Sequence, residues 1–345
     1  MSALYWLLRQ LGLRHIVRLN KAKRLSDRFI RGFYVTHALL GLASVGFLQE
    51  LGDQGSVDLA EFASREGIDL EILTPLCEYL YGLKILRWEG QRYALDTTGE
   101  LISDMLMGAL LSVQAYANIL YHLEPLLRGQ EHYGSEVRRR PRLVAEGSGL
   151  SAQLLAFPLV ASLLRKKGSR HVLDLACGDG TFLEVLCSHD DRITGYGLDI
   201  APEAIELGRR RLATRGLEDR IHLFVADMFR IDEITYPLPE IDAITCIYAL
   251  HEFLTENGEQ VVELLRKLRG RFPQTPLIVC EVIRHSPDEL RRKPGGLLEI
   301  QLVHALSGQR LGTRQEWREI FRRAGFTEME ERYLGFVRTD IFTVR

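Results

Sequence analysis

The stretch HVLDLACGDGTFLEVL, residues 171–186, decides the fold of this 345-residue chain. Its apolar start predicts a buried strand over 171–176, and its second half predicts a helix over 179–188, with small residues in the turn between them. The turn has the spacing D-x-A-x-G-x-G, and Thr181 stands where a dinucleotide-binding motif would place its last glycine. The loop therefore lacks the form that cradles a pyrophosphate, and it favours a nucleoside-like ligand without phosphate groups.

The rest of this half of the chain alternates between strands and helices. Predicted strands cover 193–199, 221–226, 241–247 and 276–282, and predicted helices cover 202–215 and 252–270. Such alternation indicates right-handed crossovers and a parallel sheet that is covered by helices on both faces. Ligands of such sheets bind at the carboxyl ends of the strands, so the residues that follow each strand are the candidate site residues.

Two acids at strand ends narrow the ligand to S-adenosylmethionine. GLDIAP ends the second strand in Asp199, which can accept hydrogen bonds from ribose hydroxyls, although an NAD enzyme would show the same acid. VADMF ends the third strand in Asp227, whose carboxylate can accept from an adenine amino group while Met228 and Phe229 pack against the ring. A helix cap is the alternative role of Asp227. S-adenosylmethionine carries no phosphate, which agrees with the first loop.

Residues 1 to about 100 predict a separate domain with a winged-helix outline. A chain of 345 residues exceeds the size at which a single hydrophobic core stops growing. Asp58 can cap a first helix that ends near Asp69, and a second helix then runs to about Leu83. RWEGQRYAL then predicts a hairpin that turns at Glu89-Gly90.

This domain lacks the charges that a DNA-reading winged helix needs. Its second helix reads DLEILTPLCEYL, with Asp69, Glu71 and Glu78 where a recognition helix carries basic or amide side chains. Phosphate groups would repel these acids, so no nucleic acid partner is expected. We expect the apolar faces of the domain, including a buried helix over 32–48, to pair with a second subunit. Residues 1–100 are therefore predicted to be a dimerisation domain.

The composition is typical of an enzyme that acts on a small molecule. The net charge is −2 with 26% charged residues, which gives no electrostatic reason to expect a nucleic acid or membrane partner. The five cysteines are scattered and form no C-x-x-C pair, so we expect reduced thiols in a cytoplasmic protein.

Residues 101–165 are predicted to form helices that link the two domains and cover the site. The RRRPR cluster at 138–142 is typical of a solvated surface, with binding of a substrate carboxylate by one arginine as the alternative.

Four ordered motifs, VLDLACGDGTFL, GLDIAP, VADMF and ALHEF, follow the winged-helix domain. In this order the chain resembles the class I S-adenosylmethionine-dependent methyltransferases of the small-molecule O-methyltransferase superfamily. The resemblance implies an α/β, Rossmann-like catalytic domain over 166–345 with a seven-stranded, mostly parallel sheet. It also implies a homodimer through the N-terminal domain and S-adenosyl-L-methionine as cofactor. The positions it assigns to cofactor binding are Asp174, Ala176, Gly178, Asp179, Gly180, Asp199, Asp227 and Met228.

The segment IDAITCIYALHEF carries the predicted catalytic residues. In plant-type members of the superfamily, a histidine followed by an acid and an aromatic residue deprotonates a phenol, and His251, Glu252 and Phe253 match that pattern. LIVCEVI places Glu281 at the end of the next strand, where its carboxylate can orient the imidazole and stabilise the imidazolium. The predicted catalytic residues are therefore His251, Glu281 and Glu252.

The segment LEIQLVHALSGQRL departs from the plant-type pattern. The second glutamate of those enzymes has no counterpart near Leu311 or Gly312, and the chain carries His304 instead. In this respect it is similar to a smaller branch, the C-methyltransferases of 2-oxo acids such as phenylpyruvate and 2-oxo-arginine. That resemblance implies a transition metal ion, iron or zinc, held by His251 and His304, with the substrate chelated through its carboxylate and keto oxygens.

Three functions stay open at this point, and a catalytically inactive partner subunit is a further alternative, against which the intact His251–Glu281 pair argues. The first is C-methylation of a 2-oxo acid through a metal-stabilised enolate, and the second is O-methylation with His251 as base and no metal. The third is a winged-helix regulator that senses S-adenosylmethionine, against which the acidic helix argues. The substrate is open as well: acids would suit a guanidino group, and tyrosines an aromatic or aliphatic one. These residues are Glu252, Glu281 and Glu299, and Tyr116, Tyr121 and Tyr248, respectively.

Overall fold

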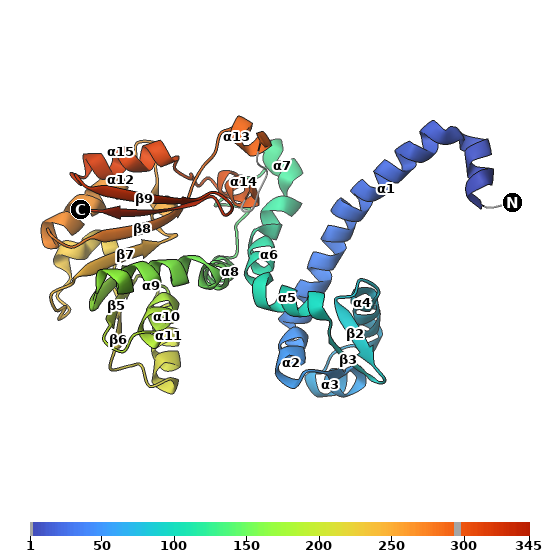
Figure 1. The fold of residues 1–345 in the computed structure, drawn as a ribbon, viewed down its shortest axis with the longest axis horizontal. Coiled ribbons are helices and arrows are strands. Elements are labelled where there is room, and N and C mark those ends of the chain that lie inside the picture. The colour runs from blue at the N-terminus through green and yellow to red at the C-terminus, as the bar shows by residue number, and fades with distance from the viewer. Residues whose placement is uncertain (1–2, 293–297) are drawn as a thin grey trace. The chain divides into compact units, whose positions relative to one another are not determined.

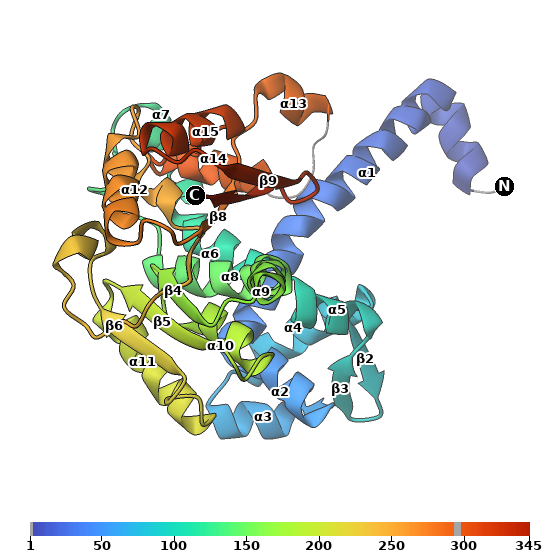
Figure 2. The same cartoon turned by 60° about the vertical axis from the view of Figure 1, so that its left-hand side comes forward.

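The computed structural model describes residues 3–292 and 298–345 and divides into two compact units (Figure 1, Figure 2). The first unit covers Met1–Gln114 and the second covers Ala115–Arg345. The boundary between them falls inside one helix, α6 (Met107–Tyr121).

The first unit is mainly helical and contains a small sheet with the strand order β1-β3-β2. Its elements are α1 (Ala3–Ser44), α2 (Phe47–Gln54), β1 (Val57–Asp58), α3 (Leu59–Glu66), α4 (Leu70–Gly82), β2 (Leu86–Glu89), β3 (Arg92–Leu95) and α5 (Thr97–Met105). α3 starts at its predicted cap, since the Asp58 carboxylate accepts from the Glu61 N–H at 2.9 Å. Asp69, which was expected only to end the first helix, caps α4 and accepts from the Glu71 N–H at 2.8 Å. β2 and β3 form the predicted hairpin.

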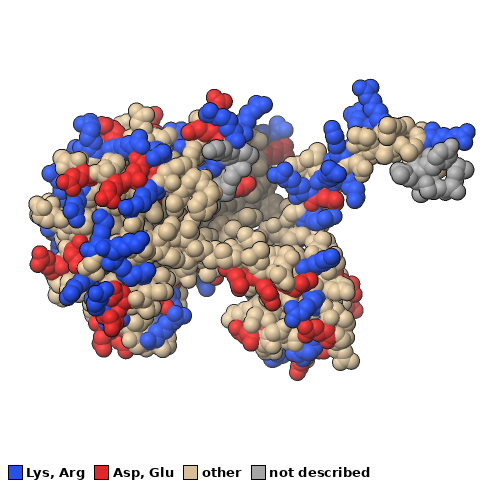
Figure 3. All heavy atoms as spheres, in the orientation of Figure 1, with Lys and Arg blue, Asp and Glu red and all other residues tan. Residues whose placement is uncertain are grey.

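The long helix α1 is mostly uncovered. From Trp6 to His37 none of its side chains is buried, and Lys and Arg are spread along it (Figure 3). The prediction of one buried helix over 32–48 is therefore wrong at its start, where Phe33 is 52% exposed. It is wrong near its end as well, because the chain turns at Gly46, whose φ of 78° is left-handed. Only the last turns of α1 pack against α2.

The second unit holds a seven-stranded sheet and the helices that cover it. Four helices precede or open the sheet region: the end of α6, α7 (Leu123–Leu127), α8 (Pro141–Leu154) and α9 (Ala156–Lys167). The strands are β4 (His171–Leu175), β5 (Thr194–Asp199), β6 (Ile221–Val225), β7 (Ala243–Ile247), β8 (Leu277–Val282), β9 (Met329–Leu334) and β10 (Thr339–Val344). The later helices are α10 (Thr181–Ser188), α11 (Pro202–Thr214), α12 (Glu259–Arg271), α13 (Pro287–Arg292), α14 (Leu298–Leu306) and α15 (Arg314–Arg323), with short 3₁₀ turns η1 (Met228–Glu233) and η2 (Leu250–Phe253).

The strand order in the large sheet is β6-β5-β4-β7-β8-β10-β9. The first five of these strands are parallel, and β10 runs antiparallel to both of its neighbours. This arrangement confirms the predicted seven-stranded, mostly parallel sheet. The order reverses at β4, so the loop after β4 lies at the place where ligands of open α/β sheets bind.

Two apolar layers bury the two faces of the sheet. Helices α9, α10 and α11 pack on one face, with Val160, Leu183 and Ile205 fully buried. Helices α12 and α15 pack on the other face through residues such as Leu265 and Trp317. The sheet is therefore covered on both sides, as the alternating pattern predicted.

The prediction of one helix over 252–270 is wrong at its start. The chain forms the 3₁₀ turn η2 at Leu250–Phe253, and α12 begins only at Glu259. The cause is Gly258, the N-cap residue of α12. Its left-handed φ of 62° breaks the helical path between η2 and α12. The turn η2 therefore presents its residues at the end of β7 and does not extend α12.

Among the residues that the structure describes, no single helix is long and apolar enough to cross a bilayer. Two helix pairs, one formed by α1 and α2 and the other by α8 and α9, reach that length and hydropathy only when joined across bends of 72° and 54°.

Candidate active site

The loop after β4 is shaped by residues with left-handed backbone. Ala176, Gly178 and Gly180 have φ values of 52°, 57° and 77°. A Cβ atom at Gly178 would point into open space, whereas one at Gly180 would lie 2.8 Å from a methyl carbon of Leu223 on β6. Gly180 is thus required by packing, whereas the space beside Gly178 is open.

The carboxylate of Asp199 ties the ends of β4 and β5 together. It accepts hydrogen bonds from the N–H groups of Gly178 at 2.8 Å and Ala201 at 2.9 Å. Asp227 caps η1 and accepts from the Phe229 N–H at 2.9 Å, while Met228 is buried in the core. The cap that the sequence left as an alternative for Asp227 is therefore present. Its role toward an adenine ring remains a prediction.

Asp174 is the buried acid of the loop. Its side chain is 3% exposed and accepts a hydrogen bond of 2.6 Å from the Thr245 hydroxyl on β7. Burial raises the pKa of Asp174 to about 7, and the charge of Asp199 acts in the same direction. Asp174 is thus poised between its neutral and charged forms at neutral pH.

Asp179 fastens the loop to helix α11. Its carboxylate forms an ion pair with Arg211 and accepts a hydrogen bond of 2.6 Å from the Thr181 hydroxyl. Gly208 on the same helix packs so closely that a Cβ there would lie 2.2 Å from the Asp179 carbonyl oxygen. The Asp179 side chain therefore serves the loop's own structure, and contact with a cofactor remains a prediction.

Strands β7 and β8 are parallel neighbours and bring His251 onto Glu281. Tyr248, with φ of 55°, turns the chain at the end of β7, and η2 follows. The Glu281 carboxylate is fully buried and accepts from the Leu250 N–H at 2.8 Å and from Nδ1 of His251 at 2.7 Å. Burial alone lowers the pKa of His251, but the charge and hydrogen bond of Glu281 outweigh it, so the pKa is raised.

His304 on α14 faces His251. Its Nδ1 lies 2.7 Å from the carbonyl oxygen of Ile300, and its Nε2 lies 3.3 Å from Nε2 of His251. A carbonyl oxygen only accepts, so Nδ1 of His304 carries the hydrogen, as Nδ1 of His251 does toward its carboxylate. When both rings are neutral, each Nε2 atom therefore carries no hydrogen, and the lone pairs of the two Nε2 atoms face each other. Burial, with the charge of His251, lowers the pKa of His304 to about 4, so its ring is neutral at pH 7.

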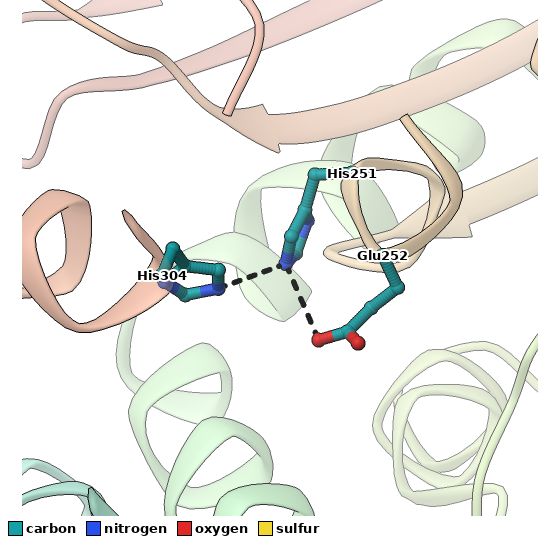
Figure 4. Close-up of side chains that lie close together, drawn as sticks. All are labelled: His251, Glu252 and His304. Carbon is teal, nitrogen blue, oxygen red and sulfur yellow. Dashed lines mark hydrogen bonds and ion pairs between the residues drawn. The ribbon is translucent and has the colours of Figure 1, made fainter. Parts of the chain in front are cut away.

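Glu252 completes a group of three donor residues. The donor atoms of His251, Glu252 and His304 all lie within 4.8 Å of one another, and the three side chains point toward one another (Figure 4). The Glu252 carboxylate is held by the Arg139 guanidinium through two bonds of 3.0 and 2.7 Å, and it also accepts from the Gln309 amide. Burial raises the pKa of Glu252, but the hydrogen bond and charge of Arg139 outweigh it, so the carboxylate stays ionised.

These donors fit a transition metal ion. Two nitrogen ligands about 2.1 Å from one ion, at about 90–110° to each other, lie about 3.0–3.4 Å apart. The Nε2 atoms of His251 and His304 are 3.3 Å apart. Each Nδ1 donates to an oxygen, which is the usual way that a metal-binding imidazole is oriented. A proton between the two Nε2 atoms is the other cation that would relieve the facing lone pairs.

The contacts that Arg139, Tyr116 and Gln309 make in the site were not predicted, although the sequence marks the RRRPR cluster and Tyr116 as candidates for substrate contact. Arg139 comes from the RRRPR cluster and binds Glu252, while Tyr116 accepts from Arg139 at 3.3 Å and Gln309 closes the group. Glu299 on α14 is exposed, and its place near the substrate stays a prediction. Tyr121 is 62% exposed.

Known proteins resemble this chain in sequence and in fold. Residues 172–270 match a family model described as "Methyltransferase domain". The 2-ketoarginine methyltransferase of Streptomyces arginensis is 30% identical over 307 residues, which cover 86% of each chain. Methyltransferase ungE' of Aspergillus campestris is 22% identical and spans 82% of this chain and 85% of its own.

A solved structure of human N-acetylserotonin methyltransferase in complex with S-adenosylmethionine has the same fold, with a TM-score of 0.70, 19% identity and coverage of 94% of this chain and 97% of the human one. The identity and coverage of the 2-ketoarginine methyltransferase extend the likeness over both units of the chain. The chain belongs to the S-adenosylmethionine-dependent methyltransferases, in the family of small-molecule O-methyltransferase-like enzymes.

Proposed function

We propose that this methyltransferase acts on the carbon next to the keto group of a 2-oxo acid, with an iron or zinc ion held by His251 and His304. The observation that carries the proposal is the pair of facing Nε2 atoms, 3.3 Å apart, whose rings have both Nδ1 atoms engaged by oxygens. The similarity to the 2-ketoarginine methyltransferase, whose substrate is a 2-oxo acid, supports this substrate class.

The carbon nucleophile explains why a cation is needed. Protons next to a ketone are too weakly acidic for a histidine to remove at neutral pH. An ion held by His251 and His304 would supply positive charge to the substrate's keto oxygen and so lower the energy of the enolate. The enolate carbon bonds to the methyl carbon of S-adenosylmethionine while the sulfur–methyl bond breaks and S-adenosylhomocysteine leaves.

Residues of the chain orient the ligand atom, accept the substrate proton and hold the methyl donor. Glu281 keeps the hydrogen of His251 on Nδ1, which leaves Nε2 free as a ligand atom. Glu252 receives the substrate proton, because its side chain is 29% exposed whereas that of Glu281 is 0% exposed. Arg139 holds Glu252 in place and balances its charge. The predicted cofactor residues around Gly178 and Asp199 hold the methyl donor at the end of β4.

A second function rests on the His251–Glu281 pair alone. A histidine oriented by a buried carboxylate at 2.7 Å is a sound general base for a phenol or another hydroxyl, with no metal needed. In that case the methyl group would appear on oxygen, and His304 would matter little.

Metal content and product analysis separate the two functions. Protein purified without a histidine tag is assayed for bound metal and incubated with labelled S-adenosylmethionine and a panel of 2-oxo acids and phenols. We expect about one iron or zinc ion per chain, loss of activity in chelator, and a new carbon–methyl bond in the product. Full activity in chelator with a methyl ether as product would replace the first function by the second.

His304→Ala provides the matching test at one residue. Because His304 would supply one of two imidazole ligands, we expect the variant to lose the metal and at least about 100-fold in kcat. Exchange of the substrate's acidic C–H for deuterium, with S-adenosylhomocysteine in place of the donor, should stop as well. Wild-type exchange and turnover in His304→Ala would contradict the metal role.

We also propose that the protein forms a homodimer through the first unit. The uncovered side chains of α1 include Phe29, Ile30 and Phe33, which are 65%, 56% and 52% exposed. DNA binding is not proposed, because Asp69 and Glu71 stand at the start of α4. A retardation assay at low salt should therefore show no shift of duplex DNA.

A further inference from the structure

Helix α14 carries His304 but has little apolar packing of its own. Among the residues of Leu298–Leu306, His304 is the one buried side chain, at 7% exposure. Val303 and Leu306 are only partly buried, against a small cluster that includes Tyr116 and Ile119. Hydrophobic burial usually fixes the rotation of a helix, so other contacts must fix the direction in which His304 points.

Gln301 supplies such a contact one turn before His304. Its amide oxygen accepts from the His285 N–H at 3.0 Å, and its amide nitrogen donates to the His285 carbonyl at 3.1 Å. Both bonds are made to the backbone just after β8, the strand that carries Glu281. The two bonds together restrain the amide in one orientation, which a single bond would not do.

The backbone at His285 is itself held in place. The His285 ring bonds to the Tyr333 hydroxyl on β9 at 2.8 Å, and the next residue, Ser286, donates from its N–H to Glu289 at 2.9 Å. Gln301 therefore ties α14 to the segment that follows β8, which is itself bonded to β9 through Tyr333.

A second anchor lies on the far side of His304. The Gln309 N–H donates to the His304 carbonyl at 2.8 Å, and the Gln309 side chain bonds to Glu252 and Arg139. His304 is thus flanked by two polar contacts. Gln301 bonds to the backbone that follows β8, and Gln309 bonds to the carboxylate of Glu252.

We propose that Gln301 is a positioning residue, which sets the direction of His304 and thereby the spacing of the two Nε2 atoms. The inference rests on the proposed function, because it assigns Gln301 a role toward the metal site. Gln301 lies three residues from His304, so it acts through the helix and not by contact with the ion.

Cobalt binding tests this inference without any need for turnover. Co²⁺ is titrated into metal-free wild type, Gln301→Met and Gln315→Met, and the visible d–d absorption is followed. Gln301→Met keeps the length of the side chain and loses both bonds, and Gln315 is an exposed glutamine on α15 that serves as the matched control. Affinity for S-adenosylhomocysteine, measured by calorimetry, reports whether the cofactor loop is intact.

We expect Gln301→Met to bind Co²⁺ about 10–100-fold more weakly and with a changed absorption spectrum, as removal of outer-shell support does at other metal sites. Its affinity for S-adenosylhomocysteine should stay within about twofold of wild type, and Gln315→Met should match wild type in both assays.

Three results would overturn the inference in distinguishable ways. Failure of wild type to bind Co²⁺ would remove the metal part of the proposed function and the role of Gln301 with it. Equal Co²⁺ binding by wild type and Gln301→Met would remove only the role of Gln301. Loss of S-adenosylhomocysteine binding in Gln301→Met would show that the residue supports the fold as a whole.

Discussion

Asp174 makes the stability of the unliganded protein depend on pH. The pKa of this buried acid is about 7, against an ordinary value of 3.8, so between about pH 4 and 7 the folded state holds a proton that the unfolded state has lost. Stability therefore falls as pH rises through this window. Asp174→Asn removes the titration and can still accept from Thr245 through its amide oxygen. We expect the variant to gain on the order of 1–3 kcal/mol over wild type at pH 8.

The same comparison at pH 5 supplies the check. At pH 5 the wild type has passed through only the first part of this window, so urea unfolding without S-adenosylmethionine should give a clearly smaller gain for the variant than at pH 8. Asp104→Asn replaces an exposed acid on α5 and should show no difference between the two pH values. An equal gain for Asp174→Asn at pH 5 and pH 8 would rule out titration as the cause.

Single residues were predictable where they end a strand. Asp199 and Glu281 follow directly from the alternating pattern, because carboxyl ends of parallel strands meet at one edge of the sheet. His304 could be placed near His251 only through a family resemblance, since it lies 53 residues further along on a helix with little periodic pattern. The pairing of Arg139 with Glu252 could not be predicted from the sequence, because 113 residues separate them and no local pattern links the two.

At the scale of elements, the close approach of α11 to the β4 loop should be sensitive to one added methyl group. A Cβ at Gly208 would lie 2.2 Å from the Asp179 carbonyl oxygen, which is backbone and cannot swing away. We expect Gly208→Ala to lower the melting temperature and to weaken S-adenosylmethionine binding at least about 10-fold. Calorimetric titration and a thermal scan measure the two effects.

Gly270 on α12 is the control for this change. A Cβ there meets nothing within 4 Å, so Gly270→Ala should keep cofactor affinity and gain up to about 1 kcal/mol from helix propensity. If both variants bind S-adenosylmethionine as wild type does, close packing of α11 on the loop is not needed for the cofactor site.

Element types were more predictable than element limits. The strands from β4 to β8 follow from apolar runs, and the cap of α3 follows from an acid placed before a helix. The start of α12 did not, because the left-handed Gly258 overrides a helical pattern that begins near Glu252. The antiparallel strands β9 and β10 were implied by the resemblance and not by the alternation.

At the scale of the whole molecule, the uncovered face of α1 predicts the oligomeric state. Three- and four-residue spacing puts Leu19, Ile30 and Phe33 on one side of this helix and Lys21 and Arg24 on another. We expect a dimer by light scattering coupled to size-exclusion chromatography, and a monomer for Ile30→Glu with Phe33→Glu. Lys21→Glu with Arg24→Glu changes charge on the other side and should leave a dimer. A monomeric wild type would contradict the proposal.

The five buried cysteines can report when each unit of the chain unfolds. All five thiols are free and buried, and burial raises the pKa of Cys77 to about 12 and of Cys187 to about 11. Alkylating reagents react with the thiolate, so the cysteines of the folded chain should resist them. Modification of a cysteine should therefore show that the region around it has unfolded. Cys77 lies in the first unit and the other four in the second. Mass spectrometry of labelled peptides would thus time the two units separately within one chain.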